Sequence, residues 1–168
     1  MIYILRHQQG NVHTNCLSKL GMERCYKLYI HLSKICTQPK IFTCFAKESK
    51  HIRPIQTASI LATHFDKPLQ LTSIEDLPPL STCETQDVII IWHHHDIPSI
   101  IKHYGSVTSF RWNDDNYDGC VIMDSEGKWR FEEHYFTNVF KLFVKCKIQR
   151  WVDLLLPWNL LRRYLKRN

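Results

Sequence analysis

The chain has 168 residues, of which 44% are apolar and 23% are charged. This size and composition are typical of one globular domain with a hydrophobic core, and they argue against a disordered or fibrous protein. No stretch approaches the roughly 18 consecutive apolar residues of a membrane-spanning helix. The first apolar run reaches Arg6 too early for a signal peptide, so we expect none.

The net charge of +6 is distributed unevenly along the chain. Residues 141–168 carry eight basic side chains and one acidic side chain, whereas residues 1–140 carry 14 basic and 15 acidic ones. The tail is therefore strongly basic and the body is nearly neutral. Because an argument for nucleic-acid binding would rest on the tail alone, we expect no specific nucleic-acid partner.

Seven cysteines are scattered along the chain, and none forms a Cys-x-x-Cys pair. This odd number and spacing match neither a disulfide framework nor a zinc ribbon. The cysteine pattern therefore predicts reduced thiols and a cytoplasmic location.

Short apolar runs alternate with segments of helical periodicity from one end of the chain toward the other. The side chain of Ser18 is a suitable N-cap for the first helix. The run Val88–Trp92 is the clearest strand, because it is unbroken and β-branched like a strand buried on both faces. In chain order, the predicted elements are a strand over 1–5, a helix from about 18, a strand over 40–45, a helix from about 48 to 65, a strand over 69–73, a loop over 73–87, a strand over 88–92, a helix over 96–104, and strands over 107–112, 119–124 and 128–131.

This alternation predicts an α/β fold, a three-layer α/β/α sandwich with a mostly parallel central sheet. In such sheets ligands bind beyond the carboxyl ends of the strands. Arg6 and His7 follow the first strand directly, His93 follows the strand 88–92, and Arg53 lies near the start of a helix. If the sheet brings them together, these four side chains form a pocket for a dianionic phosphoryl group.

Several motifs, taken in order, resemble those of the histidine phosphatase superfamily, also called phosphoglycerate mutase-like. The opening Ile4-Leu5-Arg6-His7 is similar to the family's Leu-x-Arg-His-Gly, and Arg53-Pro54-Ile55-Gln56-Thr57-Ala58 is similar to its Arg-Ala-x-Gln-Thr-Ala. Further similar stretches are Leu17–Glu23, Ile91–His93 continuing to Asp96-Ile97-Pro98, and Trp112 with Asn116-Tyr117-Asp118. Together they cover about residues 1–124.

The resemblance implies a small, metal-independent phosphatase that hydrolyses a phosphomonoester through a phosphohistidine on His7. Arg6, Arg53 and His93 would bind the phosphate oxygens and stabilise charge in the transition state. The implied substrate is a phosphorylated small molecule or a phosphoprotein, and no cofactor or metal is implied.

The general acid for the leaving oxygen is open among three carboxyl groups. The family places it in the loop after the arginine-containing helix, which favours Glu75 or Asp76. Another branch of the superfamily places the acid directly after the second histidine, so Asp96 is the alternative.

Two residues depart from the family pattern, since Gln8 and His94 stand where the family has glycine. Glycine allows the backbone to approach a ligand closely. A catalytically impaired member that binds phosphate or a phosphoprotein is therefore the alternative function. The consecutive histidines 93–95 also suggest zinc, but we expect their side chains to diverge along an extended segment and no metal site to form.

The chain is expected to divide into a phosphatase-like domain, residues 1–140, and a basic amphipathic helical segment, residues 141–168. Apolar residues of this segment recur at helical spacing, with an interruption at Pro157. Packing of the segment on the sheet or on a second subunit, as in a homodimer, is favoured. Contact with an anionic membrane surface is the alternative.

Overall fold

The computed structural model describes residues 1–11, 13–46, 52–105 and 109–132. It divides the chain into two units, Met1–Tyr135 and Phe136–Asn168. The predicted segment 141–168 lies outside the described residues. Its boundary at residue 140 and its contacts with a membrane or a second subunit therefore stay predictions.

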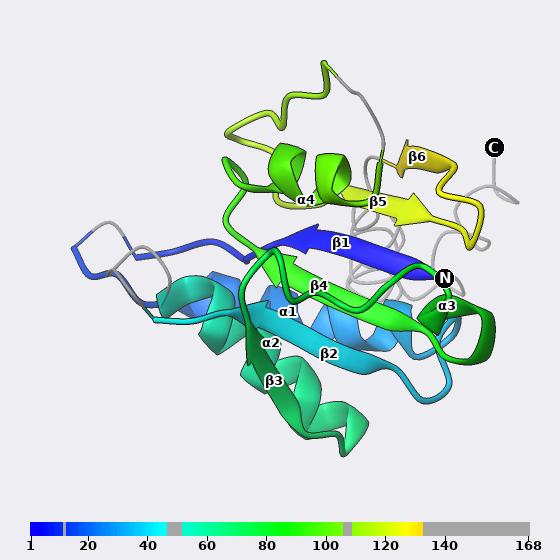
Figure 1. Ribbon diagram of the computed structural model, residues 1–168. Coiled ribbons are helices and arrows are strands. Elements are labelled where there is room, and N and C mark those ends of the chain that lie inside the picture. Colours follow the sequence, from blue (N-terminus) through cyan, green and yellow to red (C-terminus); the bar gives the residue numbers. More distant parts are fainter. Residues whose placement is uncertain (12, 47–51, 106–108, 133–168) are drawn as a thin grey trace, which may run out of the picture. The chain divides into compact units, whose positions relative to one another are not determined.

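The described part is an α/β fold around a six-stranded sheet of order β3-β2-β4-β1-β5-β6 (Figure 1). The pairs β1–β4, β4–β2 and β2–β3 are parallel, whereas β5 is antiparallel to both of its neighbours. The sheet is thus mostly parallel, as predicted. In chain order the elements are β1 (Ile2–Arg6), α1 (Lys19–Leu32), β2 (Lys40–Cys44), α2 (Ile52–Phe65), β3 (Leu69–Thr72), α3 (Thr82–Thr85), β4 (Val88–Trp92), α4 (Ile97–His103), β5 (Cys120–Met123) and β6 (Trp129–Glu132).

Helices cover both faces of the sheet, with α1 and α2 on one side and α4 on the other (Figure 1). Residues of α4, such as Ile97 and Ile101, pack with Ile4 of β1 and Ile90 of β4 in one hydrophobic cluster. The alternate residues of the two central strands face the opposite way. This arrangement confirms the predicted three-layer sandwich and explains why β1 and β4 are apolar without a break.

The register of β1 and β4 brings the ends of these two strands to the same point. Arg6 is paired with Trp92, and the His7 amide donates a hydrogen bond to the Trp92 carbonyl over 3.1 Å. His7 and His93 therefore leave the sheet side by side at its carboxyl edge, where the sequence predicted the ligand site.

Helix α1 begins where the sequence predicts, because Ser18 caps it. The Ser18 hydroxyl accepts from the Gly21 amide over 2.9 Å and donates to the Gln9 carbonyl over 3.1 Å. A Cβ atom on Gly21 would fall 2.0 Å from that same carbonyl oxygen. Glycine is therefore required here for the helix to pack closely against the segment after β1.

Two expectations differ from the structure. The strand predicted over 107–112 is wrong for its described residues, 109–112, which belong to no strand. Phe110 and Trp112 instead pack against Phe131, with ring centroids 5.1 Å and 5.2 Å away, and Trp112 Nε1 donates to the Asn116 carbonyl. Their apolar pattern thus reflects a loop anchored by aromatic side chains. The predicted loop 73–87 also contains the short helix α3.

All six cysteines in the described part of the chain are free thiols, as the sequence predicted. Burial raises the pKa of Cys25 and Cys36 to about 12, so these thiols are protonated at neutral pH. In the described ranges, no helix has the length and apolar character needed to cross a membrane.

Candidate active site

The imidazole rings of His7 and His93 face each other at the carboxyl edge of the sheet. Their centroids are 5.4 Å apart and the rings are tilted by 35°. His7 is almost completely buried, with 1% of its surface exposed, and His93 is partly buried. The two histidines that the sequence predicted at separate strand ends are therefore brought together by the parallel pairing of β1 and β4.

One ring nitrogen of His7 is held by the backbone. Nδ1 lies 2.8 Å from the Gln8 carbonyl oxygen, and a carbonyl accepts hydrogen bonds only, so Nδ1 carries the proton and donates. In the neutral ring Nε2 then holds the lone pair. This tautomer is the one that attacks an electrophilic phosphorus atom.

The surroundings of His7 keep the ring neutral. Burial lowers its pKa from the ordinary 6.5 to about 3, and the charges of Arg6, His93 and Arg53 act in the same direction. The hydrogen bond to the Gln8 carbonyl opposes this shift only in part. His7 is thus unprotonated at neutral pH without the help of a general base.

We expect this neutral burial of His7 to make the folded state less stable in mild acid. Below about pH 6.5 the unfolded chain takes up a proton on His7, whereas the folded chain does not until the pH approaches 3. The contribution of His7 to the free energy of unfolding therefore falls as the pH is lowered through this window. Urea unfolding of the wild type and His7→Gln between pH 7 and pH 4.5 measures it. The variant should show the weaker pH dependence, and equal slopes would contradict a neutral His7.

Arg6 is a buried guanidinium that the loop 113–117 surrounds. Its Nη1 donates to the carbonyls of Asn113 and Asn116 over 3.4 Å each and to the carbonyl of Asp114. The guanidinium carbon lies 3.9 Å from the centroid of the Tyr117 ring. The Nε atom is buried and finds no hydrogen-bond acceptor among the described residues. A buried donor of this kind calls for an acceptor other than those that the described residues supply.

Arg53, the second residue of α2, lies against the loop between β1 and α1. A Cβ atom on Gly10 would fall 2.2 Å from Arg53 Nε, so this close approach depends on glycine. Arg53 Nη2 donates to the carbonyls of Asn11 and Thr14 over 3.4 Å each. The positive charge of Arg53 lowers the pKa of both Arg6 and His7, as expected for a cationic group that lies near these two side chains.

The neighbours of Arg53 in its motif fix the backbone after β1. Gln56 accepts a hydrogen bond from the Leu17 amide over 2.7 Å, and the Thr57 hydroxyl accepts one from the Gln8 amide over 3.0 Å. These contacts tie α2 to both ends of the loop between β1 and α1. They give a structural reason for the glutamine and threonine of this motif.

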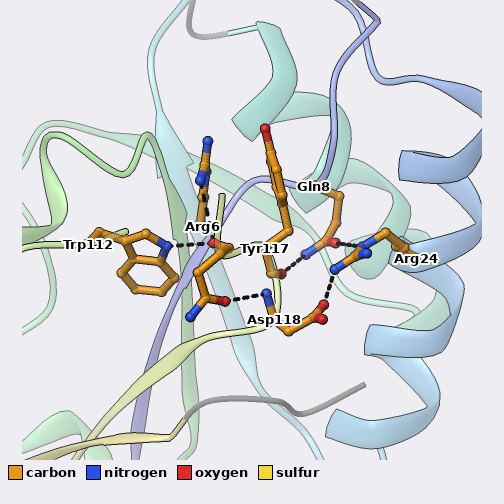
Figure 2. A network of polar contacts seen from close by, with 7 residues as sticks. Arg6, Gln8, Arg24, Trp112, Tyr117 and Asp118 are labelled. Atoms are coloured by element: carbon orange, nitrogen blue, oxygen red, sulfur yellow. Dashed lines mark hydrogen bonds and ion pairs between the residues drawn. The ribbon is translucent and has the colours of Figure 1, made fainter. Parts of the chain in front are cut away.

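Gln8, which replaces the family's glycine, is the centre of a polar network (Figure 2). Its Nε2 donates to the Tyr117 carbonyl over 3.2 Å, and its Oε1 accepts from Arg24 Nε over 3.2 Å. Arg24 also forms an ion pair with Asp118. Gln8 therefore links α1 to the loop that surrounds Arg6, and its side chain is directed toward Arg24 and Tyr117. The sequence did not predict that Arg24 anchors this loop, because Arg24 and its partner Asp118 are 94 residues apart and no local pattern relates them.

The three consecutive histidines do not diverge. Residues 94–96 form a turn rather than an extended strand, and the rings of His94 and His95 have centroids 3.9 Å apart. His94 Nε2 also lies 2.9 Å from a carboxylate oxygen of Asp114. The expectation that these side chains separate is wrong, because the backbone turns immediately after β4.

The three candidate acids lie in two places. Glu75 and Asp76 are exposed in the loop after β3, where Asp76 accepts a hydrogen bond of 2.8 Å from the Ser73 hydroxyl. Asp96 is partly buried and directly precedes α4. Glu75 and Asp76 stay the predicted acid, with Asp96 as the alternative.

Comparison with known proteins gives a clear result for the fold. No family model and no curated protein matches the sequence. Among solved structures, a mycobacterial glucosyl-3-phosphoglycerate phosphatase is 13% identical with a TM-score of 0.50, covering 79% of this chain and 96% of its own. The protein histidine phosphatase SixA, solved with tungstate, is 12% identical with a TM-score of 0.50, covering 78% of this chain and 93% of its own. The chain thus shares the fold of these two phosphatases, which agrees with the phosphoglycerate mutase-like fold that its motifs predicted.

Proposed function

We propose that this protein is a metal-independent phosphatase that hydrolyses a phosphomonoester through a phosphohistidine on His7. The observation that carries the proposal is the pairing of His7 with His93 at the ends of adjacent parallel strands, beside the buried Arg6. A neutral nucleophile next to fixed positive charge is what phosphoryl transfer needs, since catalysis depends on positioning and charge compensation.

In the first step, Nε2 of His7 attacks phosphorus and the bond to the leaving oxygen breaks. A carboxyl group, Glu75 or Asp76 with Asp96 as alternative, donates its proton to that oxygen. In the second step the same carboxylate accepts a proton from water, and the hydroxide oxygen attacks the phosphohistidine. Phosphate leaves and His7 returns to its neutral form.

Arg6, Arg53 and His93 bind the three non-bridging phosphate oxygens in this mechanism. The unpaired Nε donor of Arg6 supports this role, because a phosphate oxygen is a suitable acceptor for it. The SixA structure holds tungstate, a tetrahedral oxyanion like phosphate, and this supports anion binding within the fold. The substrate is a phosphorylated small molecule or a phosphoprotein.

The alternative is a catalytically impaired member that binds phosphate or a phosphoprotein. It is favoured by Gln8 at the glycine position and by the three loop carbonyls that already accept from Arg6 Nη1. The side chain of Gln8 is used by Arg24 and Tyr117, however, and this supports a site that the substitution leaves intact.

Hydrolysis of an aryl phosphate by the full chain in the presence of a metal chelator distinguishes the two functions. A phosphatase turns the substrate over under these conditions, is inhibited by vanadate, and forms an acid-labile phosphoenzyme. Vanadate binding without turnover would favour the binding protein. Absence of both would contradict a phosphate site at His7.

A further inference from the structure

We propose that His94, His95 and Asp114 form a binding site for Zn²⁺ beside the phosphate pocket. One ligand atom from each of these side chains lies within 4.8 Å of the others. The site joins the turn after β4 to the loop before β5, segments that no local sequence pattern relates. This inference does not depend on the proposed phosphatase activity.

His94 is the fixed member of the set. It is buried, with 7% of its surface exposed, and the described part of the chain offers neither ring nitrogen a hydrogen bond of good geometry. Its Nε2 nevertheless lies 2.9 Å from Asp114 Oδ1. A buried imidazole nitrogen that lacks a hydrogen bond of good geometry and lies beside a carboxylate is available as a metal ligand.

His95 and Asp114 are the adjustable members. Both are exposed, and 69% of the Asp114 side chain is open to solvent. Ligand atoms about 2.0–2.1 Å from a tetrahedral zinc ion lie about 3.4 Å from one another. On binding, His94 Nε2 and Asp114 Oδ1, now 2.9 Å apart, must therefore separate slightly, and any pair near the 4.8 Å limit must approach. Rotation of two exposed side chains achieves this without movement of the core.

The chemistry of the three side chains favours zinc over harder cations. Two imidazoles and one carboxylate suit Zn²⁺, whereas Mg²⁺ and Ca²⁺ require oxygen ligands. Three protein ligands leave the fourth tetrahedral position to water. The positive charge of the neighbouring Arg6 disfavours a cation, and the Asp114 carboxylate offsets it.

A second set, His7, His93 and His94, also lies within 4.8 Å. It contains no carboxylate to balance the charge of the ion. We therefore assign the ion to the outer set, His94, His95 and Asp114, rather than to this inner set. Zinc binding to variants of His7 and of His95 distinguishes the two sets.

Calorimetric titration of Zn²⁺ into the full chain, free of any affinity tag and stripped with a chelator, tests the proposal. We expect one ion per chain and a loss of affinity of at least tenfold in both His95→Ala and Asp114→Asn. His103→Ala, at the end of α4, is the matched control because it removes another exposed histidine, and it should bind like the wild type. His7→Ala should also retain binding.

Substitution with Co²⁺ identifies the ligand types. The visible bands should show tetrahedral coordination without a thiolate charge-transfer band, and circular dichroism should show that each variant is folded. No stoichiometric binding, or full affinity in both His95→Ala and Asp114→Asn, would overturn the proposal. Loss of binding in His7→Ala, or a thiolate band, would also overturn it, because the ion would then lie in the inner set or on cysteine.

Discussion

Replacement of His7 by alanine should abolish hydrolysis of an aryl phosphate, with a fall in kcat on the order of 10⁴-fold or more. His7 is the buried imidazole whose Nδ1 is held by the Gln8 carbonyl and whose Nε2 carries the lone pair. Steady-state rates and acid-labile phosphoenzyme, measured on the same preparation, should disappear together.

His103→Ala is the control for this experiment, since it removes an exposed histidine on α4, and it should retain wild-type kcat. The His7→Ala protein should still bind vanadate through Arg6, Arg53 and His93. A variant that keeps its activity within tenfold of wild type would rule out the phosphohistidine mechanism.

Replacement of Arg6 by alanine should weaken vanadate binding and lower kcat by about 10²–10³-fold, the usual effect of losing one transition-state donor. The substitution removes the unpaired Nε donor and the charge next to His7. Arg6→Lys keeps a positive charge but not the planar group of donors that arginine provides. Its kcat and vanadate affinity should therefore lie between those of Arg6→Ala and the wild type. Vanadate inhibition constants and kcat for both variants measure the effect.

Arg24→Ala separates phosphate binding from loop anchoring. It removes the contacts to Gln8 and Asp118 and leaves Arg6 in place (Figure 2). It should loosen the loop 113–118, seen as faster proteolysis there, with a smaller loss of vanadate affinity than Arg6→Ala. Equal losses in the two variants would show that Arg6 acts through the loop rather than on phosphate.

The sequence predicted that His7 and His93 would meet at one edge of the sheet, because both follow recognisable strands. An apolar β-branched run ends at Arg6 and another ends at Trp92, and the parallel pairing of these strands brings His7 and His93 together. Ser18 and Gly21 marked the start of α1 through capping that depends only on neighbouring residues. The strand error over 107–112 arose because buried aromatic residues give the same pattern in an anchored loop as in a strand.

By itself, the sequence determined most of the strands and helices, which residues follow the strand ends, and the chemistry that the His7 side chain offers. These depend on short-range periodicity and on residue type. Only the tertiary structure decided how Gln8 is used, how His94 meets Asp114, and that Arg24 holds Asp118. The physical reason is that each of these contacts joins loops or helices far apart in the chain, and its free energy depends on a backbone path that no local pattern encodes.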